Sequence, residues 1–246
     1  MRYFMTFSYD GTAYSGYQKQ PDKMTIQDEL EKVLYKLNGD REVSVCSSGR
    51  TDAGVHALNQ KAHFDMDKEY DVELLKNSIN KMLPWDIYIK KIEIVDDNFH
   101  ARFNVSAKEY IYKINTGEYN PIQKNYVYQF NKRLDVSEME RALKYLEGEH
   151  NFKSFTKSTD EIKDYNRKII QTSLIRDTKN INEITISIMG TGFLRYMVRN
   201  IVGLLIEIGQ GKYKSEDIFD ILKAEDREAA GITAPPNGLY LKDVFY

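Results

Sequence analysis

The sequence predicts an α+β fold, and three observations indicate it. Apolar and polar residues alternate as in strands at 3–9, 42–46, 61–66 and 87–95. Two stretches with helical spacing lie among these strands, which gives the order strand, helix, strand, loop, strand, helix, strand. The rest of the chain contains the same kinds of element without a literal repeat. The economical architecture is two related α+β units whose strands join in one sheet.

Both helices in the first part of the chain have recognisable ends. The first helix begins at Thr25, which has an acidic residue three positions later, and ends at Gly39. Its apolar residues recur at helical spacing, namely Leu30, Val33, Leu34 and Leu37. The second helix covers residues 71–83 and stops before Pro84.

The second part of the chain is predicted to begin with a strand at 108–114 that places Tyr110, Tyr112 and Ile114 on one face. An extended connector follows at 116–133, and the polar run 157–166 is expected to be mobile. The remaining predicted elements are a helix at 136–146, strands at 168–175 and 181–189, helices at 193–208 and 215–222, and a strand at 239–245. Ser215 is the predicted N-cap of the last helix.

Composition indicates a globular protein with one large domain or two smaller ones, since 41% of the 246 residues are hydrophobic and 29% are charged. The net charge of −2 argues mildly against a nucleic-acid ligand. A local basic surface can nevertheless attract a nucleic acid to a protein that is close to neutral overall. The N-terminus has the pattern of a strand rather than a signal peptide, and the longest apolar run, 201–208, contains Glu207. We therefore expect a soluble, cytoplasmic protein without a membrane segment.

Metal binding is not expected from the sequence. The single cysteine, Cys46, excludes an internal disulfide and a cysteine-based zinc site. The four histidines do not show the spacing of metal ligands.

The most distinctive stretch is the loop at 47–57, with the sequence SSGRTDAGVHA. Gly49 and Gly54 bracket Arg50, Thr51 and Asp52, which indicates a tightly shaped loop. An aspartate in a turn usually accepts hydrogen bonds from its own backbone. The alternative is that Asp52 is a carboxylate held for catalysis or ligand binding.

A catalytic Asp52 would have to be ionised and aligned with its target. A nearby guanidinium would favour the ionised form, and Arg50, Arg102 and Arg199 are candidates. Arg199 lies beside a stripe of core residues, so it could instead be a side chain that extends along the surface to solvent.

The string GRTDAGVHA closely resembles the signature of the tRNA pseudouridine synthase A family. Five further segments resemble this family in the same order, and together they span nearly the whole chain: FSYDGTAYSGYQKQP, FHARF, KEYIY, MVRNIVG and GLYL. Two residues depart from the family pattern. Lys108 stands where the basic residue is often arginine, and Glu109 directly precedes Tyr110. We expect Glu109 to point to the opposite face of its strand from Tyr110.

The resemblance implies the pseudouridine-synthase fold, in which two pseudo-symmetric ferredoxin-like halves share a mainly antiparallel central sheet with helices packed on one side. Residues 1–103 would form the N-terminal half that carries the Asp52 loop. Residues 104–246 would form the C-terminal half, and the active-site cleft would lie between the halves.

The resemblance also implies an activity, the isomerisation of uridine to pseudouridine at positions 38, 39 and 40 in the anticodon arm of tRNA. In that family the residues that match Asp52, Arg199 and Tyr110 are, respectively, the nucleophile, its ion-pair partner and the ring that stacks on the target base. Arg50 and Leu241 would bind substrate. The reaction needs no cofactor, and the family acts as a homodimer. Candidate phosphate-binding residues are Arg50, Lys61, Arg102, Lys108, Arg167, Lys168 and Arg195.

Two other functions remain open from the residues alone. One is a non-catalytic RNA-binding protein on the same scaffold, which would not need Asp52, Tyr110 and Arg199 together. The other is a glycosidase-like enzyme that acts on a small nucleoside, but such enzymes usually use two carboxylates and only one strong candidate is present. The residues also leave open whether Asp52 attacks ribose C1′ or the uracil ring.

Overall fold

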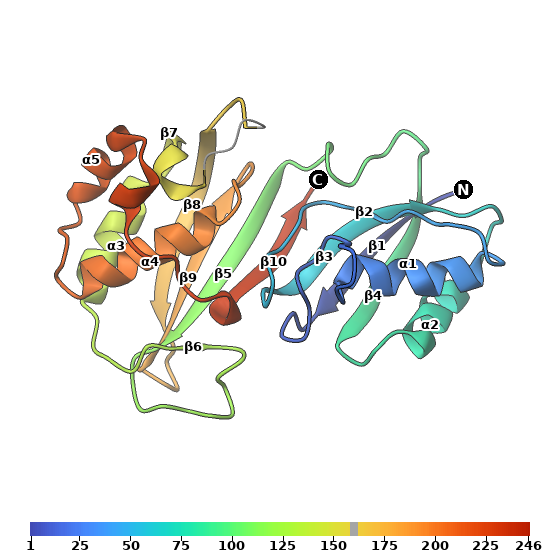
Figure 1. The fold of residues 1–246 in the computed structure, drawn as a ribbon, viewed down its shortest axis with the longest axis horizontal. Helices are drawn as coiled ribbons and strands as arrows, with labels where there is room; N and C mark the ends of the chain where they lie inside the picture. Colours follow the sequence, from blue (N-terminus) through green and yellow to red (C-terminus); the bar gives the residue numbers. More distant parts are fainter. Residues whose placement is uncertain (158–161) are drawn as a thin grey trace. The chain divides into compact units, whose positions relative to one another are not determined.

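The computed structural model describes residues 1–157 and 162–246 and divides them into two compact units. Unit 1 consists of Met1–Ser106 and Tyr240–Tyr246, and unit 2 consists of Ala107–Leu239. Both units combine helices with strands, and most strand pairs run antiparallel (Figure 1). The predicted α+β class with a mainly antiparallel sheet is therefore confirmed.

Unit 1 contains five strands: β1 (Arg2–Tyr9), β2 (Cys46–Ser47), β3 (His56–Asp65), β4 (Ile87–Val95) and β10 (Leu239–Phe245). Their order is β4-β1-β3-β10, with β2 also paired to β3. β1 is antiparallel to both β3 and β4. β10 is parallel to β3, with Tyr240 opposite His56.

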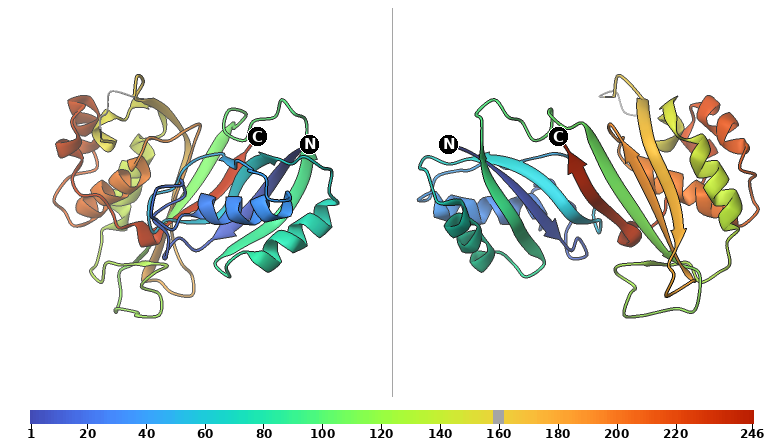
Figure 2. Two further views of the ribbon diagram at one scale, coloured as in Figure 1. Left: turned by 45° about the vertical axis from the view of Figure 1, so that its right-hand side comes forward. Right: turned by 180° about the vertical axis from the view of Figure 1, so that it is seen from behind.

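Helices α1 (Ile26–Leu37) and α2 (Val72–Met82) cover one face of the unit 1 strands (Figure 2). The side chain of Thr25 accepts a hydrogen bond from the N–H of Asp28, as the capping pattern predicts. Tyr3, Met5 and Phe7 alternate along β1 toward the helices and are fully buried. The packing of these apolar residues forms the core of unit 1.

Unit 2 contains strands β5 (Ala107–Asn115), β6 (Tyr128–Gln129), β7 (Gly148–Asn151), β8 (Asn166–Arg176) and β9 (Glu183–Gly190). The antiparallel order is β5-β9-β8-β7, and β6 pairs with β5. The helices are α3 (Val136–Tyr145), α4 (Met197–Gly209) and α5 (Asp217–Ala224), with short 3-10 helices at Lys153–Phe155, Arg227–Ala230 and Pro236–Gly238. Nearly every residue of α4 is buried, so this helix is the centre of the unit 2 core.

The strand predicted at 42–46 is wrong for most of its length, because only Cys46 and Ser47 form β2. Val43 and Val45 are buried, which explains the strand-like pattern. The backbone of Val45, however, bonds to side chains of α1: its N–H donates to Glu31 Oε1 at 3.1 Å, and its carbonyl accepts from Gln27 Nε2 at 3.3 Å. Side chains of α1 thus make the hydrogen bonds that a neighbouring strand would otherwise make with this backbone.

The helix predicted at 193–208 begins later than expected, at Met197, because Tyr196 has a left-handed backbone with φ of 62°. Ser215 is not an N-cap: α5 begins at Asp217, and Ser215 Oγ is buried without a hydrogen-bond partner among the described residues. The strands β6 and β7 were not predicted. The centre of the run expected to be mobile, 158–161, lies outside the described residues. Among those described, no helix is both long and apolar enough to cross a membrane.

Candidate functional site

The Asp52 loop connects β2 to β3, and its base is held by the buried side chain of Gln60. Ser48 Oγ donates to Gln60 Oε1 at 2.6 Å, and Gln60 Nε2 donates to the carbonyl of Gly49 at 3.0 Å. Ser48 and Gln60 are both fully buried. Buried polar groups that have hydrogen-bond partners are costly to displace, so these bonds fix the start of the loop.

The residue before Asp52 is held by a second buried contact. Thr51 Oγ1 lies 2.8 Å from the hydroxyl of Tyr9, at the end of β1. Burial raises the pKa of Tyr9 to about 12, so its hydroxyl stays protonated near neutral pH. After Asp52 the backbone turns, and the N–H of Val55 donates to the carbonyl of Asp52 at 3.2 Å.

The loop of residues 10–17, here called the opening loop, lies with its backbone against the Asp52 loop. Tyr17 N–H donates to the Thr51 carbonyl at 3.1 Å, and Gly54 N–H donates to the Tyr14 carbonyl at 3.4 Å. Gly16 has φ of 99°, and a Cβ there would lie 2.9 Å from Thr51 O. Only glycine suits both the backbone conformation and the close approach.

Unit 1 contains three of the predicted site residues. Asp52 is half-buried and Arg50 is exposed, both in the same loop. Leu241 is fully buried on β10, directly opposite Ala57 of β3.

Unit 2 contains Tyr110, which is 9% exposed on β5 and packs edge-to-face against Phe193, with ring centroids 5.1 Å apart. The neighbouring Glu109 accepts a hydrogen bond from Ser187 Oγ at 2.6 Å. It therefore lies on the opposite face of β5 from Tyr110, as the strand alternation predicts.

Arg199 lies in the first turn of α4 and is held by the main chain. Its Nε donates to the carbonyl of Ala234 at 2.8 Å, and the N–H of Ala234 donates to the carbonyl of Arg199 at 3.0 Å. Its guanidinium carbon lies 5.5 Å from the ring centroid of Tyr196. These contacts fix the orientation of the Arg199 side chain. A side chain that only extends along the surface to solvent would not need them.

Lys61 and Arg167 are among the candidate phosphate-binding residues whose side chains have other contacts. Lys61 Nζ lies 3.4 Å from Asp243 Oδ1 and 5.8 Å from the ring centroid of Tyr246. Arg167 donates to the carbonyls of Asp164 and Asn166. Neither contact removes the positive charge, but both restrict where these side chains can reach.

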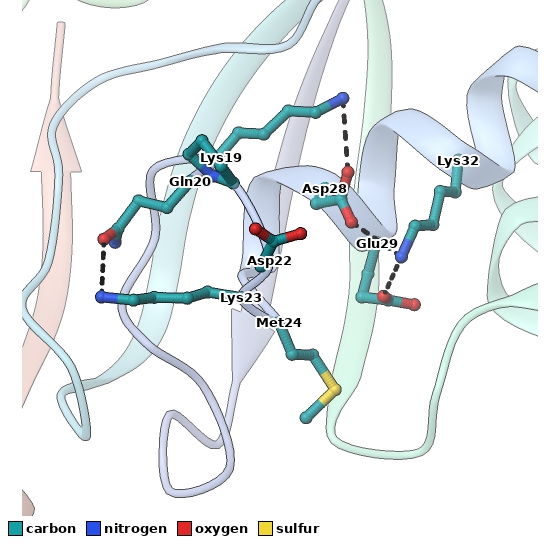
Figure 3. Close-up of a pocket in the computed structure, with 9 residues that line it drawn as sticks. Lys19, Gln20, Asp22, Lys23, Met24, Asp28, Glu29 and Lys32 are labelled. Carbon is teal, nitrogen blue, oxygen red and sulfur yellow. Dashed lines mark hydrogen bonds and ion pairs between the residues drawn. The ribbon is translucent and has the colours of Figure 1, made fainter.

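A hollow of about 500 Å³ lies beside the start of α1 (Figure 3). It is lined by Lys19, Gln20, Pro21, Asp22, Lys23, Met24, Asp28, Glu29 and Lys32. Asp28 lies 3.3 Å from Lys19 Nζ and 2.7 Å from Lys32 Nζ. Because carboxylates neutralise these lysines, the hollow does not favour an anion.

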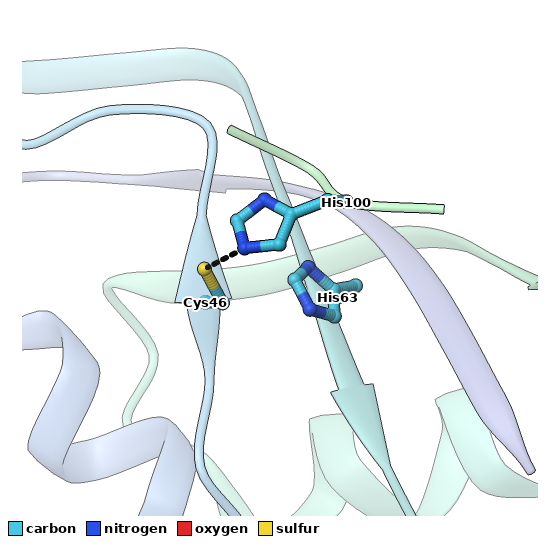
Figure 4. A group of neighbouring side chains, drawn as sticks. All are labelled: Cys46, His63 and His100. Atoms are coloured by element: carbon cyan, nitrogen blue, oxygen red, sulfur yellow. Dashed lines mark hydrogen bonds between the residues drawn. The ribbon is translucent and has the colours of Figure 1, made fainter. Parts of the chain in front are cut away.

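The structure brings Cys46, His63 and His100 together, a cluster that the sequence analysis missed because the three residues are far apart in the chain (Figure 4). Their potential ligand atoms lie within 4.8 Å of one another, and Cys46 Sγ is 3.7 Å from His100 Nε2. Burial raises the pKa of the Cys46 thiol, although Arg102, Arg2 and Arg50 act in the opposite direction.

Backbone hydrogen bonds at the two rings oppose metal binding. The N–H of Ala101 donates to His63 Nδ1 at 3.1 Å, and the N–H of Arg102 donates to His100 Nδ1 at 3.2 Å. A metal-bound histidine normally donates from its second nitrogen instead of accepting there. The bonds place the proton of each neutral ring on Nε2, so the cluster favours hydrogen bonding to sulfur over metal coordination.

A family model described as tRNA pseudouridine synthase matches residues 5–104 and 142–246. The chain belongs to the tRNA pseudouridine synthase family. It is 44% identical to tRNA pseudouridine synthase A of Bacillus subtilis (strain 168), covering 100% of this chain and 99% of the relative. It is 42% identical to the protein of that name in Streptococcus pneumoniae (strain 70585), covering 100% of this chain and 98% of the relative.

A solved archaeal box H/ACA sRNP Nop10–Cbf5 complex aligns with 96% of this chain and 60% of that chain, at 10% identity and a TM-score of 0.35. At that TM-score the likeness adds nothing to the assignment. Membership of the tRNA pseudouridine synthase family confirms the resemblance seen in the sequence and the enzyme class, an isomerase. The roles of the individual site residues remain predictions.

Proposed function

We propose that this protein isomerises uridine to pseudouridine in the anticodon arm of tRNA, at uridines 38, 39 and 40. The observation that carries the proposal is the Asp52 loop, whose sequence matches the family signature. Tyr9 holds this loop through the side chain of Thr51, and Gln60 and the opening loop hold its backbone. Such rigidity is what a catalytic carboxylate needs, because small errors in its position reduce the rate strongly.

The proposed reaction breaks the N-glycosidic bond of the target uridine, turns the uracil, and forms a carbon–carbon bond at C5. Asp52 acts as the nucleophile, at ribose C1′ or at the uracil ring, and is released when the new bond forms. The proton on C5 leaves and one is returned to the freed ring nitrogen, so the product is an isomer of the substrate. No oxidant, reductant or group donor enters the balance.

Arg199 is proposed to pair with Asp52 and to keep it ionised. Its tether to Ala234 supports this role, since a guanidinium fixed by the main chain can present a defined edge to a carboxylate. Tyr110 is proposed to stack on the uracil once it has left the helix. Extruding a base costs a few kcal/mol, and stacking on an aromatic ring returns about 1–3 kcal/mol. Arg50 and Leu241 complete the proposed substrate contacts.

The protein is further proposed to act in the cytoplasm as a homodimer. A homodimer would double the basic surface available to one tRNA, which would reconcile the net charge of −2 with an RNA substrate.

The proposal is tested by incubating the protein with tRNA from a strain that lacks it, in the presence of a chelator, and mapping pseudouridine along the RNA. We expect pseudouridine to appear at positions 38, 39 and 40 without an added cofactor. Binding without modification would favour the non-catalytic alternative, and conversion of free uridine would favour the nucleoside enzyme. Either result would overturn the proposal.

A further inference from the structure

His56 is a buried histidine just after the Asp52 loop that contacts two other segments. It is 2% exposed and opens β3, four residues beyond Asp52. Its Nδ1 accepts the N–H of Gly11 at 3.1 Å and lies 3.1 Å from Asp10 Oδ1. Its ring stacks on Tyr240 of β10, with centroids 4.7 Å apart and planes at 25°. His56 therefore joins the opening loop, the Asp52 loop and the last strand.

The opening loop packs closely against Val55, the residue before His56. A Cβ at Gly11 would lie 2.6 Å from the carbonyl carbon of Val55, the residue before His56. Asp10 is itself held, because its Oδ1 accepts from the N–H of Thr12 at 2.9 Å. A shift of residues 10–12 would therefore be passed directly to the backbone of the Asp52 loop.

The same opening loop contacts the backbone at Asp52 itself. Tyr17 N–H bonds to the Thr51 carbonyl, and a Cβ at Gly16 would lie 3.3 Å from the carbonyl carbon of Asp52. The Nδ1 contact of His56 fixes one end of the opening loop, and the contacts of Gly16 and Tyr17 lie at the other end. The position of Asp52 thus depends on where the opening loop is held.

We propose that His56 is a positioning residue for Asp52, acting through the hydrogen bond that its Nδ1 atom accepts from the N–H of Gly11. This inference rests on the proposed function, in which Asp52 is the nucleophile. It assigns to His56 no contact with the substrate. Its effect is on the geometry of the carboxylate and hence on the chemical step rather than on RNA affinity.

Two substitutions separate the Nδ1 contact from the ring stack. In His56→Asn the amide can place Oδ1 near the former Nδ1 position and accept from Gly11, but the stack on Tyr240 is lost. In His56→Phe a flat ring is kept and the hydrogen bond from the Gly11 N–H is lost. We expect the single-turnover rate at saturating enzyme to fall about tenfold to a hundredfold in His56→Phe and to stay within about threefold of wild type in His56→Asn. The dissociation constant for tRNA should not change in either variant.

His63 provides a matched control on the same strand. It is 6% exposed, and its Nδ1 accepts a backbone N–H, that of Ala101, at the same distance of 3.1 Å. We expect His63→Phe to lower the melting temperature as much as His56→Phe but to keep the wild-type rate. A second route to the same disturbance is Gly11→Ala, which leaves the His56 ring in place and should slow the reaction as His56→Phe does.

Hydrogen exchange gives a readout that does not depend on activity. Amides of residues 10–17 and 51–55 should exchange faster in His56→Phe than in wild type, His56→Asn or His63→Phe. The inference is overturned if His56→Phe reacts at the wild-type rate, if His63→Phe loses as much rate, or if exchange in these segments is unchanged. Wild-type protein that forms no pseudouridine, but shows the expected exchange pattern, would instead contradict the proposed function alone.

Discussion

Tyr110 combines an apolar ring with a hydroxyl, and the two parts can serve different purposes at a binding surface. The ring is 9% exposed and its orientation is restricted by the edge-to-face contact with Phe193. If Tyr110 acts by stacking on the extruded uracil, the flat ring is required and the hydroxyl is not. A role in proton transfer would require the opposite.

We predict that Tyr110→Phe converts tRNA at a rate within about threefold of wild type, whereas Tyr110→Leu loses about tenfold or more, since stacking on an aromatic ring supplies about 1–3 kcal/mol. Single-turnover pseudouridine formation measures both variants. Equal loss in Tyr110→Phe and Tyr110→Leu would exclude stacking as the main role.

At the scale of secondary structure, α4 connects the core of unit 2 to Arg199. Gly203 lies one turn after Arg199, and its surroundings explain why a helix interior contains glycine. A Cβ there would lie 2.8 Å from the carbonyl carbon of Ile232, and closer still to the carbonyl oxygen. The residues from 232 to 234 thus pack directly on the helix backbone, and Ala234 of this segment holds Arg199.

We predict that Gly203→Ala destabilises the protein, although alanine is better than glycine by about 1 kcal/mol in an open helix. Overpacking at this contact should cost about 1–3 kcal/mol or more. Gly209→Ala in the same helix is the control: its Cβ would meet Met139 Sδ at 2.7 Å, and this flexible side chain can move. Urea unfolding measures both. A more stable Gly203→Ala protein would contradict the packing described here.

Local sequence patterns predicted most helices and strands. They did not predict segments whose backbone hydrogen bonds are made by a distant element. The strands 87–95 and 239–245 and the first three helices matched closely, because their apolar spacing agrees with their burial. Residues 42–45 were misread as a strand: Val43 and Val45 are buried, but the backbone of Val45 bonds to Glu31 and Gln27 of α1 rather than to a strand. Nothing local indicated that Tyr196 would adopt a left-handed backbone and delay α4.

The residues of the candidate site were also predicted only in part: those in local motifs were found, and those that act through long-range contacts were not. Motif strings named Asp52, Arg199 and Tyr110, since these strings are local in sequence. Periodicity could not predict Tyr9, Gln60 and the opening loop as supports of the Asp52 loop, because those contacts join distant parts of the chain. On β3 the polar residues His56, Gln60 and His63 are buried beside Ala57, Ala62 and Phe64. Polar residues at core positions of a strand were the available signal.

At the scale of the whole molecule, stability depends on pH through paired carboxylates. Arg2 forms two hydrogen bonds with Asp65, from Nε to Oδ1 at 2.9 Å and from Nη2 to Oδ2 at 2.8 Å. This contact holds the pKa of Asp65 below its ordinary value. The folded state therefore binds fewer protons than the unfolded state, and the stability from this pair is lost as pH falls through the folded pKa.

We predict that Asp65→Asn lowers the melting temperature at pH 7, and that the difference from wild type shrinks as the pH falls below about 4, the ordinary pKa of aspartate. The effect should be modest because the carboxylate of Asp65 is largely exposed. In an Arg2→Gln background the substitution should have little effect at either pH. A difference that grows on acidification would contradict the assigned direction.

The central claim is that Asp52 is the catalytic carboxylate, and Asp52→Asn tests it most directly because it keeps the shape of the side chain and removes its charge. Saturating variant enzyme is mixed with tRNA, and pseudouridine and tRNA binding are measured in the same samples. We predict no detectable pseudouridine, with a dissociation constant within about threefold of wild type, since a carboxylate acts as a nucleophile only when ionised. Pseudouridine formation at the wild-type rate would contradict the account.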